Sequence, residues 1–249
     1  MTRHILGIQP IREALRAHAD QVERVLLLER SGASSVTLEG LARFAQSSGA
    51  TVEWVDAGSL DRIAKGVAHQ GALAFAADLK VHDFDDVLAR SPNTIVLLDQ
   101  ISDPHNFGAV IRSSVAFGAD AIVWPEHASA PLTPATFRAS AGAIEHATLC
   151  RVRKLPATLQ QAHDAAILVV GLAGDGEVVL TDLDLTGPVA LVIGSEGSGI
   201  RRTVRSACDR VVRLPTMPPV PTLNASVAAA IALYEVRRQR LAQAAALAG

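Results

Sequence analysis

The second half of the chain alternates short apolar runs with helix-like segments, and this alternation restricts the possible folds more than any other feature. One run, Thr94 to Asp99, reads TIVLLD and is continuously apolar, as parallel strands are when both of their faces are buried. Strands that alternate with helices predict a parallel, doubly wound α/β sheet. The predicted strands occupy residues 94–99, 121–124, 147–152, 167–171, 189–193 and 210–214.

An Ala-rich helix over residues 224–247 closes this half. Its apolar positions include 227, 231 and 234, with arginines beyond them. This spacing places the three side chains close together on the helix surface, so we expect one face of the helix to be buried.

The first 80 residues carry an alternation of their own, which predicts a small α/β domain. The pattern becomes polar and irregular after residue 78 and includes the turn-forming pair Ser91-Pro92. We therefore expect a substrate-binding domain over residues 1–78, a linker over 79–93 and a second domain over 94–249. Within the first domain, the expected helices are 8–18, 36–47 and 60–65, and the expected strands are 22–28, 51–55 and 73–77.

Composition excludes several classes of protein. The chain has 249 residues and is 49% hydrophobic, enough for a core without disulfide bridges. Its two cysteines, Cys150 and Cys208, are too far apart to suggest a metal cluster, and the eight histidines lack ligand spacing, so we expect no metal. No apolar run reaches the roughly 18 residues of a membrane span, and no signal-like stretch opens the sequence. These observations predict a soluble cytoplasmic protein.

The charge is unevenly distributed. A net charge of −2 argues against nucleic-acid binding, yet residues 195–240 carry eight arginines against three acids, while residues 156–194 carry five acids and no Lys or Arg. Arginine pairs bidentately with phosphate and stacks on bases, so this basic sector is compatible with an RNA partner. The same arginines could also be ordinary solvated helix surface.

Three polar or Gly-rich clusters lie where strand-like runs give way to helix-like runs, the place where α/β proteins collect groups that bind ligands. Each also has a purely structural interpretation. Asn106 could cap a helix and Arg112 could be a surface cation. The glycines could serve only a turn, and Asn224 with Ser226 could be capping groups. The clusters read DPHNFGAVIR over 103–112, GSEGSG over 194–199 and TLNAS over 222–226.

The second cluster matches neither the dinucleotide fingerprint nor a phosphate-binding P-loop. Glycines at this position let backbone approach a ligand closely, and Glu196 offers an acceptor. Four prolines at 215, 218, 219 and 221 restrict the loop that leads to the third cluster.

Together the three clusters resemble the motifs of the SpoU or TrmH family of RNA ribose 2′-O-methyltransferases. In this chain they read Asn106-x-Gly108-x-x-x-Arg112, Gly194-x-Glu196-x-x-Gly199 and Leu223-Asn224-x-Ser226. The N-terminal segment, with Gly7-Ile8 and His69-Gln70-Gly71, resembles the substrate-binding domain of members that act on a guanosine of large-subunit ribosomal RNA.

The resemblance implies a fold, a cofactor and an assembly. It implies a deep trefoil knot in the C-terminal domain, S-adenosylmethionine as the cofactor, and a homodimer that binds ribosomal RNA. Cofactor contacts would come from backbone and apolar groups at Leu172, Ala173, Gly194, Leu214 and Leu223.

The resemblance also implies a catalytic set of Asn106, Arg112, Glu196, Asn224 and Ser226. A guanidinium resists deprotonation, so Arg112 would stabilise the developing alkoxide and orient phosphate rather than act as a base. Glu196 and Asn224 would position Arg112 or relay the proton through water.

The sequence departs from the family pattern in the proline loop, at Thr216, Pro218 and Thr222. If this loop closed the cofactor site, the chain would be a non-catalytic ribosome-assembly or RNA-binding factor. A transfer RNA also remains open as the substrate, and the modified nucleotide cannot be read from the sequence. A small-molecule dinucleotide enzyme is disfavoured, because no acidic residue follows a glycine fingerprint at ribose-binding spacing.

Overall fold

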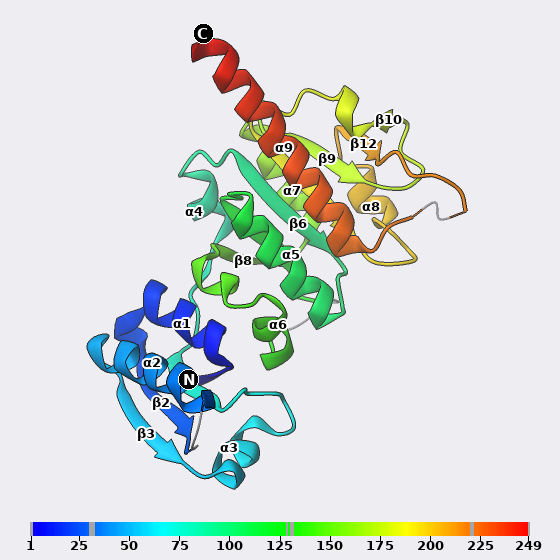
Figure 1. Cartoon of the computed structure of the whole chain (residues 1–249). Helices are drawn as coiled ribbons and strands as arrows, with labels where there is room; N and C mark the ends of the chain where they lie inside the picture. The colour runs from blue at the N-terminus through cyan, green and yellow to red at the C-terminus, as the bar shows by residue number, and fades with distance from the viewer. Residues whose placement is uncertain (1, 30–32, 128, 130–131, 220–221, 249) are drawn as a thin grey trace. The chain divides into compact units, whose positions relative to one another are not determined.

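The computed structural model describes the whole chain except residues 1, 30–32, 128, 130–131, 220–221 and 249. It divides into two compact units (Figure 1). The first contains Met1–Lys80 together with Leu132–His146, and the second contains Val81–Pro131 and Ala147–Gly249. No sequence pattern had indicated that residues 132–146 belong with the first unit.

The first unit is built on a four-stranded mixed sheet with the order β1-β4-β2-β3. Strand β4 runs antiparallel to β1 and β2, and β2 runs parallel to β3. The three helices and three strands expected here are confirmed. Strand β1 was not predicted, because polar residues make up its first half. The elements are β1 (Thr2–Leu6), α1 (Ile8–Ala17), β2 (Val22–Leu28), α2 (Ala33–Ser47), β3 (Thr51–Val55), α3 (Ala57–Ala64) and β4 (Ala72–Ala77).

Residues 132–146 form helix α6 (Pro134–Ala139) and a 3₁₀ turn (Ala143–His146) and are bound to α1 and β1 by buried polar contacts. The guanidinium of Arg3 donates to both carboxylate oxygens of Glu145, at 2.5 and 2.7 Å, and both residues are buried. A ring nitrogen of His18 lies 2.8 Å from the Glu145 carbonyl oxygen.

Close packing at Gly142 fixes the same segment. This glycine has a φ of +87°, and a Cβ there would lie 2.7 Å from the Glu13 side chain and 3.1 Å from the Pro10 backbone. The segment is therefore an integral part of the first unit.

The second unit is an eight-stranded sheet with the order β10-β12-β9-β11-β6-β7-β8-β5. Every strand pair in it is parallel, which confirms the predicted α/β class. The elements are β5 (Val81–His82), α4 (Phe84–Leu88), β6 (Thr94–Asp99), α5 (Pro104–Ala116), β7 (Ala121–Pro125), β8 (Leu149–Val152), α7 (Leu155–Asp164), β9 (Leu168–Leu172), β10 (Val178–Val179), β11 (Val189–Gly194), α8 (Arg202–Arg205), β12 (Arg210–Arg213) and α9 (Ala225–Ala248).

Central strands β6 and β11 are buried along their whole length, so both faces of the sheet are covered. The trefoil knot implied by the family resemblance stays a prediction. No helix within the described ranges is long and apolar enough to cross a membrane.

Helix α9 is half buried, but through residues other than those expected. Ala229, Leu233 and Val236 are buried, whereas Val227, Ile231 and Tyr234 remain 41–54% exposed. The expected burial of one face of the helix is therefore confirmed, but within a single chain that face does not include positions 227, 231 and 234. Small alanines let α9 pack closely against α5 and β11, and this contact uses the opposite side of the helix.

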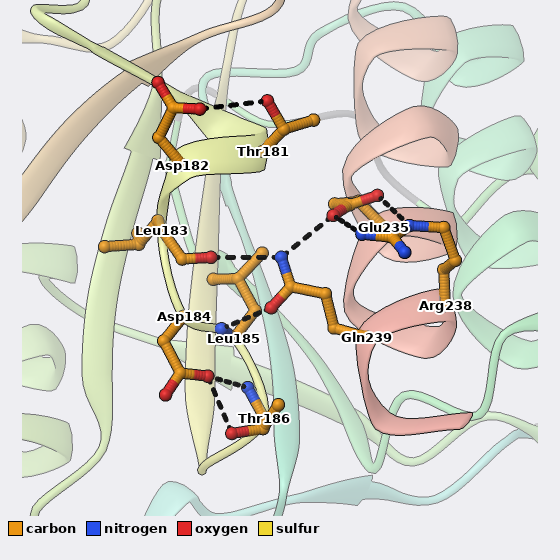
Figure 2. A network of polar contacts seen from close by, with 9 residues as sticks. All are labelled: Thr181, Asp182, Leu183, Asp184, Leu185, Thr186, Glu235, Arg238 and Gln239. Carbon is orange, nitrogen blue, oxygen red and sulfur yellow. Dashed lines mark hydrogen bonds and ion pairs between the residues drawn. The ribbon is translucent and has the colours of Figure 1, made fainter. Parts of the chain in front are cut away.

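A polar network holds the C-terminal half of α9 (Figure 2). The Gln239 amide donates to the Leu183 carbonyl at 3.0 Å and accepts from the Leu185 amide at 2.8 Å. The Glu235 carboxylate accepts from Gln239 and from Arg238. These bonds tie this part of α9 to the segment that precedes β11.

Candidate active site

Two of the predicted clusters begin at neighbouring strand ends. Strand β11 pairs with β6 in a register that sets Gly194 beside Asp99. The Asp99 side chain is fully buried and accepts from the backbone amide of Arg201 at 2.8 Å and from its Nε at 2.7 Å. Asp99 therefore ties the end of the Gly-rich loop to the end of β6, a role that sequence reasoning missed.

The Gly-rich loop returns tightly on itself after β11. Ser195 and Gly199 exchange two backbone hydrogen bonds, at 3.1 and 2.9 Å. A Cβ on Gly194 would lie 2.2 to 2.4 Å from backbone atoms of Gly199 and Ile200. Glycine is thus required at 194 because any side chain there would clash with the backbone of the same loop. The Glu196 side chain, at the tip of the loop, is exposed.

Helix α5 is capped by Asp103, which accepts from the amides of His105 at 3.1 Å and Asn106 at 3.2 Å. Pro104 occupies the first turn, where its missing N–H is not needed. The structural alternative that Asn106 caps the helix is therefore wrong. With capping assigned to Asp103, the Asn106 side chain is free to donate to Oε1 of Glu196 at 2.8 Å.

Asn224 completes a triangle of polar side chains. Its Nδ2 donates to Oδ1 of Asn106 at 2.9 Å and also to Oε1 of Glu196. Its Oδ1 accepts from the Ser226 hydroxyl at 2.6 Å and from the backbone amides of Ser226 and Val227. Asn224 is therefore both the cap of α9 and a member of the triangle, and Ser226 orients it.

Arg112 stands apart from this triangle. It lies six residues beyond Asn106 on α5, which is about 9 Å along a helix axis. Its side chain is exposed and has no hydrogen-bond or ion-pair partner among the described residues. The structure thus brings together four residues of the predicted catalytic set and leaves the fifth facing solvent.

A cavity of about 760 Å³ opens beside the triangle, between the ends of β9, β11 and β12 and the start of α9. Glu196 and Asn224 contribute to its wall. All five residues expected to bind the cofactor line it as well: Leu172, Ala173, Gly194, Leu214 and Leu223. Thr216, in the proline loop that departs from the family pattern, also lines the cavity. Pro221 of the same loop lies outside the described residues.

The cavity wall also carries an ion pair that sequence reasoning missed. Arg205 donates to Asp175 at 2.7 Å, and both residues line the cavity. The hydrogen bond from Arg205 holds the pKa of the Asp175 carboxyl below its ordinary value. Spacing could not have revealed the pair, because 30 residues separate its members.

Comparisons with known proteins agree with this geometry. Residues 93–234 match the model of the SpoU rRNA Methylase family, and residues 4–81 match the model for RNA 2′-O ribose methyltransferase substrate binding. The 23S rRNA (guanosine-2′-O-)-methyltransferase RlmB of Haemophilus influenzae is 38% identical over 248 residues, which cover 97% of this chain and 99% of that protein. RlmB of Pseudomonas syringae pv. tomato is 37% identical over 244 residues, or 96% of each chain.

Among solved structures, the SpoU methyltransferase AviRb from Streptomyces viridochromogenes in complex with AdoMet has a TM-score of 0.79 at 26% identity. The match covers 96% of this chain and 91% of AviRb. The family resemblance drawn from the three motifs is confirmed, because the catalytic-domain model alone covers more than half of the sequence. The chain therefore belongs to the SpoU rRNA methylase family.

Proposed function

We propose that this protein transfers a methyl group from S-adenosylmethionine to the ribose 2′-hydroxyl of a guanosine in large-subunit ribosomal RNA. The observation that carries the proposal is the Asn106, Glu196 and Asn224 triangle at the wall of a cofactor-sized cavity. The full-length relatives named RlmB support the choice of guanosine and of 23S rRNA. The proposed ribosomal RNA substrate favours the cytoplasm as the location of the protein.

The cavity fits S-adenosylmethionine in size and in chemistry. Its volume lies within the range of small-molecule sites, about 300 to 1,000 Å³. Leu172, Leu214 and Leu223 offer apolar surface to a purine ring, and glycine backbone is exposed beside them. Asp175 and Arg205 offer charges of both signs, which suit the ammonium and carboxylate of the methionine portion.

When bound, S-adenosylmethionine supplies an electrophilic methyl group. The protein's task is then to hold a ribose hydroxyl in line with that methyl and to receive its proton. Both amides of the triangle donate to Oε1 of Glu196, so Oε2 is the oxygen available to a further donor. We assign Oε2 to the ribose hydroxyl, to the Arg112 guanidinium or to a water that relays the proton.

Arg112 is suited to stabilise negative charge on the acceptor. Its guanidinium is a planar cation, and it is not committed to an internal partner among the described residues. It can therefore donate two parallel hydrogen bonds to the RNA phosphate or to the developing alkoxide.

We propose the division of labour expected from the sequence, with residues 1–78 binding RNA, 79–93 linking and 94–249 carrying the transfer, except that residues 132–146 belong with the first unit. We also propose a homodimer. Val227, Ile231 and Tyr234 form an exposed apolar stripe that starts one turn after Asn224, and a second copy of the chain would cover it.

The test is methyl transfer from labelled S-adenosylmethionine to ribosomal RNA from a strain that lacks the corresponding enzyme, followed by mapping of the modified ribose. We expect one guanosine of the large-subunit RNA to be labelled. Labelling of transfer RNA instead would show that the proposed substrate is wrong. If no RNA is labelled and calorimetry detects no binding of the cofactor, the protein is a non-catalytic RNA-binding factor and not an enzyme.

Arg112 variants separate charge from geometry. We expect Arg112→Ala to lower kcat by about 100-fold or more, as the loss of one preorganised donor does in other enzymes. Arg112→Lys keeps the charge but loses the fork, so it should also be impaired. Full activity of the lysine variant would contradict a bidentate role.

A further inference from the structure

The sheet of the first unit presents a row of ring and guanidinium groups on one face. His4 of β1 pairs with Phe75 of β4, and Phe75 pairs with Arg24 of β2. Residues directly opposite each other in neighbouring strands project to the same face of a sheet. We call His4, Phe75 and Arg24 the stacking row.

The groups of the stacking row are already in contact. The His4 and Phe75 rings meet edge to face, with centroids 4.9 Å apart and planes at 79°. The Arg24 guanidinium carbon lies 4.4 Å from the centroid of the Phe75 ring. The row is therefore a preformed surface and does not require the binding of another molecule to assemble.

Arg24 is fixed on one side and open on the other. Glu53 of β3 lies 3.5 Å from its guanidinium, and the Arg24 side chain is 44% exposed. The Phe75 ring covers one side of the guanidinium, and the partial exposure of the Arg24 side chain leaves it accessible to a ligand. Because these contacts already order the side chain, a ligand that stacks on it loses little rotamer entropy.

An unpaired nucleobase fits this surface better than a phosphate does. Glu53 already offsets the charge of Arg24, which weakens the attraction for an anion. Arginine planes and aromatic rings are the usual stacking partners of splayed-out bases in RNA recognition. Duplex bases keep their faces covered by neighbours and cannot use such a surface.

We propose that the stacking row binds an unpaired base of the RNA substrate on the outer face of the Arg24 guanidinium. This inference rests on the proposed function of the first unit in RNA binding and names the contact that it makes. Phe75 and Glu53 act as positioning residues that hold the guanidinium plane.

The test uses the full chain and a short single-stranded RNA that contains 2-aminopurine, a base whose fluorescence falls when it stacks. The same strand paired in a duplex serves as the second probe. We expect quenching with the single strand. Arg24→Lys keeps the charge but loses the plane, and Phe75→Leu removes the ring, so each should weaken single-strand binding at least about fivefold while duplex binding is unchanged.

The matched control is Arg16→Lys. Arg16 is an exposed arginine of α1 that pairs with Glu13 at 2.5 Å, as Arg24 pairs with Glu53, and among the described residues it lies over no aromatic ring. This variant should bind both probes like the wild type. Cofactor binding and the thermal midpoint, measured for every variant, show whether a loss comes from unfolding.

The outcomes separate the two proposals. Unchanged single-strand affinity in Arg24→Lys and Phe75→Leu, or equal losses for single strand and duplex, would refute the stacking contact. If the wild type methylates ribosomal RNA without quenching 2-aminopurine, the stacking contact is wrong and the proposed function stands. If it binds the cofactor but no RNA of either kind, the RNA-binding role of the first unit fails together with the stacking contact.

Discussion

Replacement of Gly194 by alanine tests whether the tight return of the Gly-rich loop shapes the cofactor cavity. The added Cβ would lie 2.2 Å from the Gly199 carbonyl carbon, where ordinary contacts begin at 3.4 Å, so the loop has to move by about 1 Å. Such a shift breaks the two backbone bonds between Ser195 and Gly199, worth about 0.5–1.5 kcal/mol each. Overpacking adds about 1–3 kcal/mol, which gives a total loss of about 2–6 kcal/mol.

Urea unfolding measures this loss, and isothermal titration calorimetry with S-adenosylmethionine measures the effect on the cavity. Gly187→Ala is the matched control, because a Cβ there meets no atom within 4 Å and its φ is not positive. The control should change the free energy of unfolding by less than about 0.5 kcal/mol and leave cofactor affinity intact. If Gly194→Ala unfolds at the wild-type urea concentration and binds the cofactor as tightly, the reasoning from close approach is refuted.

Three further predictions concern stability. Glu145→Ala would leave the buried Arg3 guanidinium without its ion-pair partner, so urea unfolding should show a loss of about 3–5 kcal/mol, and an unchanged midpoint would contradict a structural role for the pair. Gln239→Ala leaves two backbone groups of the 183–185 segment unpaired and should cost about 1–3 kcal/mol in the same assay, whereas a neutral result would mean that water replaces the amide. Burial raises the pKa of the Cys150 thiol to about 12 from an ordinary 9.0. As the pH rises, the thiol therefore loses its proton in the unfolded chain at a lower pH than in the folded protein. The free energy of unfolding should fall as the pH rises from about 9 toward 12. Cys150→Ala should make that pH dependence shallower without abolishing it, because burial also raises the pKa of Cys208 to about 12, and an equally steep profile would assign the dependence to other groups.

Apolar patterning predicted most of the elements, because a parallel strand that is buried on both faces appears in the sequence as an uninterrupted run of apolar residues. Thr94–Asp99 and Val189–Gly194 are such strands, and they lie at the centre of the sheet. Strand β1 was not predicted because its first three residues, Thr2, Arg3 and His4, are polar. The buried Arg3 is paired with a carboxylate that lies 142 residues away in the sequence. A local pattern carries no information about such a partner.

The sequence predicted the residues of the site but not the hydrogen bonds between them. Asn106 could have been the cap of α5, yet the cap is Asp103, three residues earlier. The site assignments therefore remain predictions about chemistry, although the side chains of Asn106, Glu196 and Asn224 do meet.

The arginine-rich C-terminal sector shows a similar limit of sequence reasoning. Arg201 pairs with Asp99 and Arg205 with Asp175, and Arg240 donates to Thr94 and to two backbone carbonyls. Much of the positive charge that favoured an RNA partner is thus used inside the second unit. Counting arginines cannot distinguish those that hold the fold from those that face a ligand.

The inclusion of residues 132–146 in the first unit has a consequence for how the two units can be separated or exchanged. The chain passes from one unit to the other near residues 80, 131 and 146, so a single cut cannot release either unit intact. A fragment that ends at Lys80 would lack Glu145 and would expose the surface of α1 that packs against the returning segment. Grafting the first unit onto another methyltransferase would therefore require transfer of two separate stretches of sequence, and a fusion made at the first crossing alone should express poorly.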